Sequence, residues 1–196
     1  NFRLDYCVIL LAFMKSIEGI ILKNSPRREA DAVFTLYTKE HGLMELQAKS
    51  VRKHSGKLRH GLDMFNHTEV FFVPSKHIPI ITDFKIKDSH LVLKNDLYRL
   101  KLAHFATQII FRIFEPGFSE EKIWQQTTNF FSILNNKYAT RDGLKESAYL
   151  WCYQILDSSG LNPRAPDFKL ADSAILRTKI KDMFLNNFGV NLDKLI

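Results

Sequence analysis

Short β-like runs divided by turn residues fill the first half of the chain, and this pattern restricts the fold more than any other feature. The runs are rich in β-branched, aromatic and other apolar residues and span 17–22, 32–38, 43–48, 68–73 and 78–86. Turn-forming residues separate them, among them Asn24-Ser25-Pro26, His41-Gly42 and Pro74-Ser75. Five short strands within about 70 residues are typical of a small closed barrel such as an OB-fold.

The second half of the chain changes to a helical period. Apolar residues recur at three- and four-residue steps over 97–114, until Pro116 stops the run. Ser119 is the expected N-cap of a second helix, because an apolar series at helical spacing follows it. Two further helices are expected at 142–158 and 173–188. The predicted fold class is therefore α+β, with an N-terminal five-stranded OB-fold β-barrel followed by an α-helical domain.

Two domains are expected, joined by a packed junction near 87–95. We assign residues 14–90 to the OB-fold and residues 91–196 to the helical domain. Residues 1–13 are interpreted as a non-native or disordered extension, because Met14 directly precedes the first strand-like run. The apolar stretch that ends at Met14 is shorter than the roughly 18 residues of a membrane span, so no membrane partner is expected.

The charge of the chain favours a polyanionic partner. Lysine and arginine number 28 against 21 aspartate and glutamate, which gives a formal net charge of +7. The two cysteines, Cys7 and Cys152, lie far apart and form no CxxC pair, so neither a zinc ribbon nor a disulfide framework is expected. A reducing cytoplasm fits this usage of cysteine.

The cationic residues are most concentrated between residues 49 and 61, here called the basic segment. It contains no acidic residue and lacks an apolar period, so it is expected to be a loop between the third and fourth strands. In that position its cations can follow a phosphate backbone, although a solvated surface loop is the alternative. The cations are Lys49, Arg52, Lys53, Lys57 and Arg59.

Arg27 and Arg28 form a second, smaller basic patch after the turn at Pro26. They are further candidates for DNA contact, but ion pairs with Glu29 or Asp31 are the default expectation.

Aromatic residues near the basic segment could stack on bases. The candidates are Tyr37, Phe65, Phe71 and Phe72. Phe71 and Phe72 cannot both be core residues, because neighbouring side chains of a strand point to opposite faces. One of the two is therefore available for a base or for contact with the helical domain.

Patterns of catalytic and metal-binding residues are absent from the sequence. It has no GxxxxGK[ST], GxGxxG, HExxH or GxSxG motif, and its seven histidines show no metal-ligand spacing. We therefore expect no enzymatic activity, no cofactor and no metal site.

Several segments together resemble the N-terminal domain of the RecO family. They are GIILK at 19–23, EAD at 29–31, LYTKEHGL at 36–43, AKSVR at 48–52 and KLRHGLDMF at 57–65, with weaker similarity in GLNP at 160–163 and IKDMFLNNFG at 180–189. The resemblance implies an OB-fold followed by a helical domain, in a mediator of DNA repair and recombination of the RecFOR type. It also implies binding to single- and double-stranded DNA, annealing of complementary strands and, with RecR, assistance in loading RecA onto strands coated by single-strand DNA-binding protein.

The same resemblance implies two further properties and one departure. Family members dock the acidic, hydrophobic-ended tail of single-strand DNA-binding protein on the helical domain, and they work in the bacterial cytoplasm near the nucleoid. Many of them insert a four-cysteine zinc module after the segment that matches 160–163, whereas here only residues 164–171 precede the last helix, so the module is expected to be absent. A protein-interaction adaptor without DNA binding and an RNA-binding OB-fold protein are the alternatives.

Overall fold

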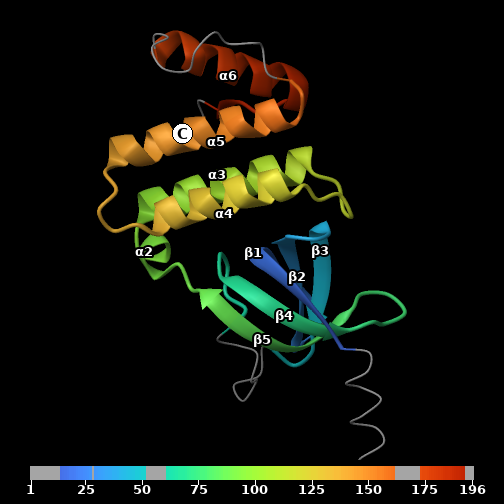
Figure 1. The fold of residues 1–196 in the computed structure, drawn as a ribbon. Helices are drawn as coiled ribbons and strands as arrows, with labels where there is room; N and C mark the ends of the chain where they lie inside the picture. Colours follow the sequence, from blue (N-terminus) through green and yellow to red (C-terminus); the bar gives the residue numbers. More distant parts are fainter. Residues whose placement is uncertain (1–13, 28, 52–60, 162–172, 193–196) are drawn as a thin grey trace, which may run out of the picture. The chain divides into compact units, whose positions relative to one another are not determined.

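The computed structural model describes residues 14–27, 29–51, 61–161 and 173–192. The chain divides into two compact units (Figure 1): Asn1–Ser89 with Glu115–Ser119, and His90–Phe114 with Glu120–Ile196. Residues 1–13 lie outside the described residues, so their interpretation as an extension stays a prediction. The first unit is a barrel and the second is helical, which confirms the expected fold class.

The strands of the first unit close into a barrel in the order β1-β2-β3-β5-β4 (Figure 1). They are β1 (Lys15–Arg27), β2 (Asp31–Thr38), β3 (Gly42–Ala48), β4 (His67–Val73) and β5 (Ile80–Asp88). Neighbouring strands are antiparallel, except that β3 and β5 meet in parallel at Gln47 and Ile80. This parallel contact closes the barrel.

Strand β1 is longer than the sequence pattern indicated, because Asn24, Ser25 and Pro26 continue the strand instead of ending it. All three pair with β2, whereas the pairing of β1 with β4 is confined to Lys15–Ile20. The second edge of β1 is therefore unpaired along this half in the described residues, and a proline there removes no ladder hydrogen bond.

The barrel core is built from inward-facing side chains of every strand. Alternate residues of β4 are buried, and nearly all of β2 is buried. Among the described residues, two members of this core lie outside the strands: Val51 is 6% exposed and Leu62 is 2% exposed. Val51 directly precedes 52–60 in the chain, and Leu62 follows it after Gly61.

The described residues of the second unit include the four helices expected from sequence and one short helix that the pattern did not predict. The helices are α2 (Leu91–Lys94), α3 (Leu97–Ile113), α4 (Glu121–Asn135), α5 (Arg141–Ser158) and α6 (Ser173–Phe188). Helix α2 has four residues, too few to show a period. The expected N-cap was wrong: Glu120 precedes α4, and the Ser119 hydroxyl donates instead to the carbonyl of Lys39 in the first unit.

Aromatic side chains form the centre of the helical unit, where α3, α4 and α5 pack against one another (Figure 1). Phe130 stacks on Trp151 with ring centroids 5.2 Å apart, and Phe105 meets Trp151 edge-on at 6.2 Å. The Trp151 indole N–H donates to the Thr127 hydroxyl at 3.3 Å, which satisfies the buried donor. Much of the unusual phenylalanine content is therefore core.

Candidate nucleic-acid interface

Two of the seven expected DNA-binding residues, Arg27 and Lys49, belong to the described part of the chain. The other five lie outside it: Arg28, Arg52, Lys53, Lys57 and Arg59. Arg27 ends β1, and Lys49 follows the last residue of β3. Both side chains are exposed.

The structure brings Arg27 and Lys49 to the same end of the barrel. They line an open depression of about 210 Å³, here called the barrel-end hollow. Its lining residues are Arg27, Gln47, Lys49, Ser75, His77, Ile78 and Ile80. They come from the start of the β1–β2 turn, the end of β3, the β4–β5 loop and the start of β5. In OB-folds, these two loops and the face of the second and third strands bind oligonucleotides.

The two cations have no carboxylate partner among the described residues. The expected ion pair of Arg27 with Glu29 or Asp31 is not formed, although Arg27 and Asp31 are opposite each other in the β1–β2 ladder. The Asp31 carboxylate is engaged elsewhere, as an acceptor from Gln47 Nε2 at 3.1 Å and from the Ser50 backbone N–H at 2.8 Å. Both cations are thus available to an external anion.

Asp31 also sets the direction of the chain as it enters the basic segment. Ser50 has a φ of 55°, in the left-handed region that costs a non-glycine residue about 1 kcal/mol. The hydrogen bond from the Ser50 N–H to Asp31 offsets part of this cost. The carboxylate therefore holds the end of β3 so that Lys49 lies beside the hollow.

The β4–β5 loop is fixed by its own serine. The Ser75 hydroxyl donates to the Ile78 carbonyl at 2.6 Å and accepts from the His77 N–H at 3.4 Å. Below the loop, the Gln47 N–H donates to the Pro79 carbonyl at 2.8 Å and connects the loop to β3. The hollow is therefore bordered by backbone with its own hydrogen bonds.

The sequence of the barrel matches a known protein family. Residues 14–90 match the family described as recombination protein O N terminal. Curated proteins named DNA repair protein RecO align with the chain over longer stretches. The N-terminal barrel of the chain therefore belongs to the RecO family. The resemblance noted in the sequence is thereby confirmed, and the barrel is a RecO N-terminal domain.

The similarity to individual RecO proteins covers different shares of the chain. The protein of Moorella thermoacetica is 31% identical over 100 residues, which are 51% of this chain and 38% of the relative. That of Desulforamulus reducens is 24% identical over 166 residues, 84% of this chain and 62% of the relative. That of Dehalococcoides mccartyi is 28% identical over 148 residues, 74% of this chain and 56% of the relative. The chain thus spans about half the length of these RecO proteins.

The aromatic side chains expected to stack on bases are mostly buried in this RecO barrel. Tyr37 and Phe65 are each 1% exposed, so their availability to a ligand was a wrong expectation. Phe72 is 5% exposed and belongs to the core cluster of the barrel, whereas Phe71 points to the other face of β4 and is partly exposed. The prediction that these two neighbours are not both core residues is therefore confirmed.

Sequence reasoning missed most of the residues that complete the hollow. Gln47, His77 and Ile78 carry no motif, and Pro74-Ser75 indicated only a turn. Their meeting depends on the parallel closure of β3 and β5, which are not consecutive in the chain. The OB-fold assignment was the one signal that could have found them, because the β1–β2 and β4–β5 loops of this fold are known to bind ligands.

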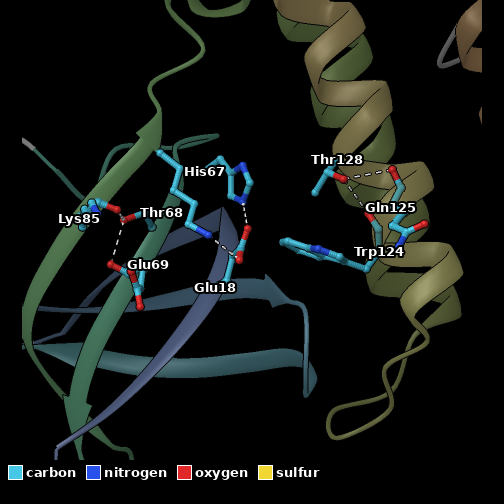
Figure 2. Close-up of polar contacts among 9 residues, drawn as sticks. Glu18, His67, Thr68, Glu69, Lys85, Trp124, Gln125 and Thr128 are labelled. Carbon is cyan, nitrogen blue, oxygen red and sulfur yellow. Dashed lines mark hydrogen bonds and ion pairs between the residues drawn. The ribbon is translucent and has the colours of Figure 1, made fainter.

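A charged cluster joins three strands at the opposite end of the RecO barrel. Figure 2 shows the Glu18 carboxylate facing His67, whose Nε2 is 2.8 Å from Glu18 Oε1. The Lys87 ammonium lies 2.5 Å from Glu18 Oε2. Burial raises the pKa of the Glu18 carboxyl, but hydrogen bonds and charge from Lys87 and His67 outweigh it, so the pKa lies below its ordinary value of 4.5.

Acid is expected to weaken the barrel through Glu18. Because the folded-state pKa is the lower one, Glu18 stabilises the fold above its unfolded pKa, and this stabilisation is lost as the pH falls through the folded pKa. Thermal unfolding followed by circular dichroism should show that Glu18→Gln lowers Tm by about 3 °C at pH 7 and that this gap closes toward pH 3. Glu45→Gln, at an exposed position of β3, is the control. An equal Tm gap at both pH values would contradict the assignment.

None of the helices in the described part of the chain combines the length and the hydrophobicity that a bilayer crossing requires. No group of three or more His, Cys, Asp or Glu side chains is placed to hold a metal ion within these same residues. Residues 162–172, the region in which the sequence leads us to expect no zinc module, lie outside the described residues, so that expectation stays a prediction.

Proposed function

We propose that this chain is a non-catalytic DNA-binding mediator of repair and recombination. The observation that carries the proposal is the barrel-end hollow, where Arg27 and Lys49 meet between the two loops that bind oligonucleotides in OB-folds. Cations without carboxylate partners in the described structure can replace the counterions of a phosphate backbone, and the release of those ions drives binding.

The basic segment extends this surface in the proposal. Lys49 is both a lining residue of the hollow and the first cation of the segment. The four further cations of the segment follow Lys49 in the chain and lie outside the described residues. Arg28, next to Arg27 in the chain, adds another cation.

Family membership supports the finer role. It comprises binding of single- and double-stranded DNA, annealing of complementary strands and, with RecR, loading of RecA onto strands coated by single-strand DNA-binding protein. The proposed location is the bacterial cytoplasm, in association with the nucleoid. An RNA ligand is the alternative, which single-stranded RNA of the same sequence tests directly.

The proposal is tested by the salt dependence of binding to a labelled single-stranded oligonucleotide. Each lost phosphate contact lowers the slope of log affinity against log salt by about 0.7, so Arg27→Ala with Lys49→Ala should flatten it by about 1.4. Arg112→Ala with Lys179→Ala removes the same charge from exposed helical positions and serves as the control. The DNA-binding role of Arg27 and Lys49 would be contradicted if the salt slope of the first variant were unchanged, or if both variants flattened it equally.

A second binding function is favoured by a hollow in the helical unit. This depression of about 440 Å³ is lined by Leu97, Tyr98, Lys101 and Arg141. Leu97 is 84% exposed, and the Arg141 guanidinium lies over the Tyr98 ring, 5.7 Å from its centroid. An apolar floor with two cations is complementary to an acidic peptide that ends in a hydrophobic residue, which is the chemistry of the tail of single-strand DNA-binding protein.

Titration of a labelled acidic tail peptide checks this assignment. Arg141→Ala and Leu97→Ser should each weaken binding about tenfold, since one removes a charge and the other an apolar contact. Arg112→Ala, at an exposed position of α3, should leave binding unchanged. Equal affinity in all three variants would contradict the site. If the chain holds the tail or RecR but retains no DNA near physiological salt, the adaptor alternative replaces the mediator.

A further inference from the structure

We propose that the barrel-end hollow is a subsite for one unpaired nucleotide, and that this subsite gives the protein a preference for single strands over duplex. The inference rests on the proposed DNA binding and adds its specificity. Phosphate contacts alone give no such preference, because both kinds of DNA present the same phosphate groups.

The walls of the hollow differ in chemistry. Arg27 and Lys49 supply positive charge on one side, whereas Ile78 and Ile80 supply apolar side chains that are only partly buried. A phosphate backbone gains nothing from contact with the apolar wall. A whole nucleotide contacts both walls, the charged one with its phosphate and the apolar one with the face of its sugar or base.

The hollow has a volume of about 210 Å³, which gives room for one base or one sugar against its walls. In a duplex the base faces are stacked and hidden, so a base enters such a hollow only where it is already unpaired or after the pair is opened, at a cost of a few kcal/mol.

The apolar wall is formed before any ligand arrives. Ser75 bonds to both His77 and Ile78, and the Gln47 N–H holds Pro79. Ordering this loop on binding therefore adds little entropic cost. Within the described residues, the apolar side chains that line the hollow are Ile78 and Ile80.

The test compares the effect of one variant on binding of single-stranded and of duplex DNA. Labelled oligothymidine and a hairpin duplex of equal phosphate number are titrated by fluorescence anisotropy against the full chain. Ile78→Ser should weaken binding of the single strand about fivefold, because it removes roughly 1 kcal/mol of apolar contact. Duplex affinity should stay within about twofold, and the salt slope should not change.

Control variants make the result decisive. Ile86→Ser changes a 40% exposed isoleucine toward the other end of β5 and should bind both ligands as the wild type does. Ile78→Val keeps an apolar side chain and should lose at most about twofold on the single strand. An Ile78→Ser variant that binds both ligands normally, or loses both equally, overturns the subsite and leaves the proposed function intact. Failure of the wild-type chain to bind either ligand removes both.

Discussion

Replacement of Gly42 by alanine should destabilise the barrel by about 4 kcal/mol, a loss that few single substitutions reach. Gly42 starts β3 with a φ of 60°, a conformation that costs other residues about 1 kcal/mol or more. An added Cβ would also lie 1.9 Å from the carbonyl oxygen of Phe118. That oxygen belongs to 115–119, a strap that pairs with the β2–β3 turn through a bridge from Gly42 to Pro116 and a hydrogen bond from the Gly117 N–H to the His41 carbonyl.

Gly117→Ala separates the two causes. Gly117 lies in the same strap with a φ of 86°, but a Cβ there meets nothing within 4 Å. This variant should lose only the conformational contribution of about 1 kcal/mol. Chemical denaturation followed by far-ultraviolet circular dichroism measures both free energies. Similar losses for the two variants would show that the strap moves aside and that the close contact at Gly42 has no structural importance.

The largest functional effect is expected from Arg52→Ala, Lys53→Ala and Lys57→Ala made together. If each cation neutralises one phosphate, the triple variant should bind single-stranded DNA roughly 50-fold more weakly near 0.1 M salt, and its log–log salt slope should fall by about 2. Fluorescence anisotropy over a range of salt concentrations provides both numbers. Thermal unfolding of the triple variant is measured beside binding, and an unchanged Tm is expected if the three cations act only on DNA.

A charge-matched control distinguishes local contact from loss of net charge. Arg112, Lys122 and Lys179 are exposed on three helices, and their joint replacement by alanine removes the same three charges. This control should keep the wild-type slope. If both triple variants lose affinity equally, the basic segment is no more than part of a diffuse positive surface.

The strand and helix patterns were enough to predict the architecture. Alternation in β4 and the helical period of 97–114 reflect burial against a core, so they are readable in the chain itself. The errors in the predicted element ends arose where a residue has a tertiary neighbour, or lacks one, that the local sequence does not show. Ser119 binds the Lys39 carbonyl instead of capping a helix, and Pro26 continues β1 where the second edge of the strand has no neighbour in the described structure.

The candidate site was predicted only where charge is concentrated along the chain. Lys49 was found because it begins a run of cations, and Arg27 because it neighbours Arg28. The pairing of Asp31 with Gln47 and Ser50, which leaves Arg27 without a carboxylate, depends on which strands are neighbours. Local sequence does not contain that information.

The aromatic core of the helical unit has a practical consequence. The chain has 2 tryptophans, and both are buried in this unit, Trp124 at 4% and Trp151 at 1% exposure. Their fluorescence therefore reports the packing around two buried residues of the helical unit. A far-ultraviolet signal, to which both units contribute, measured beside it tests whether the chain unfolds in one transition or in two.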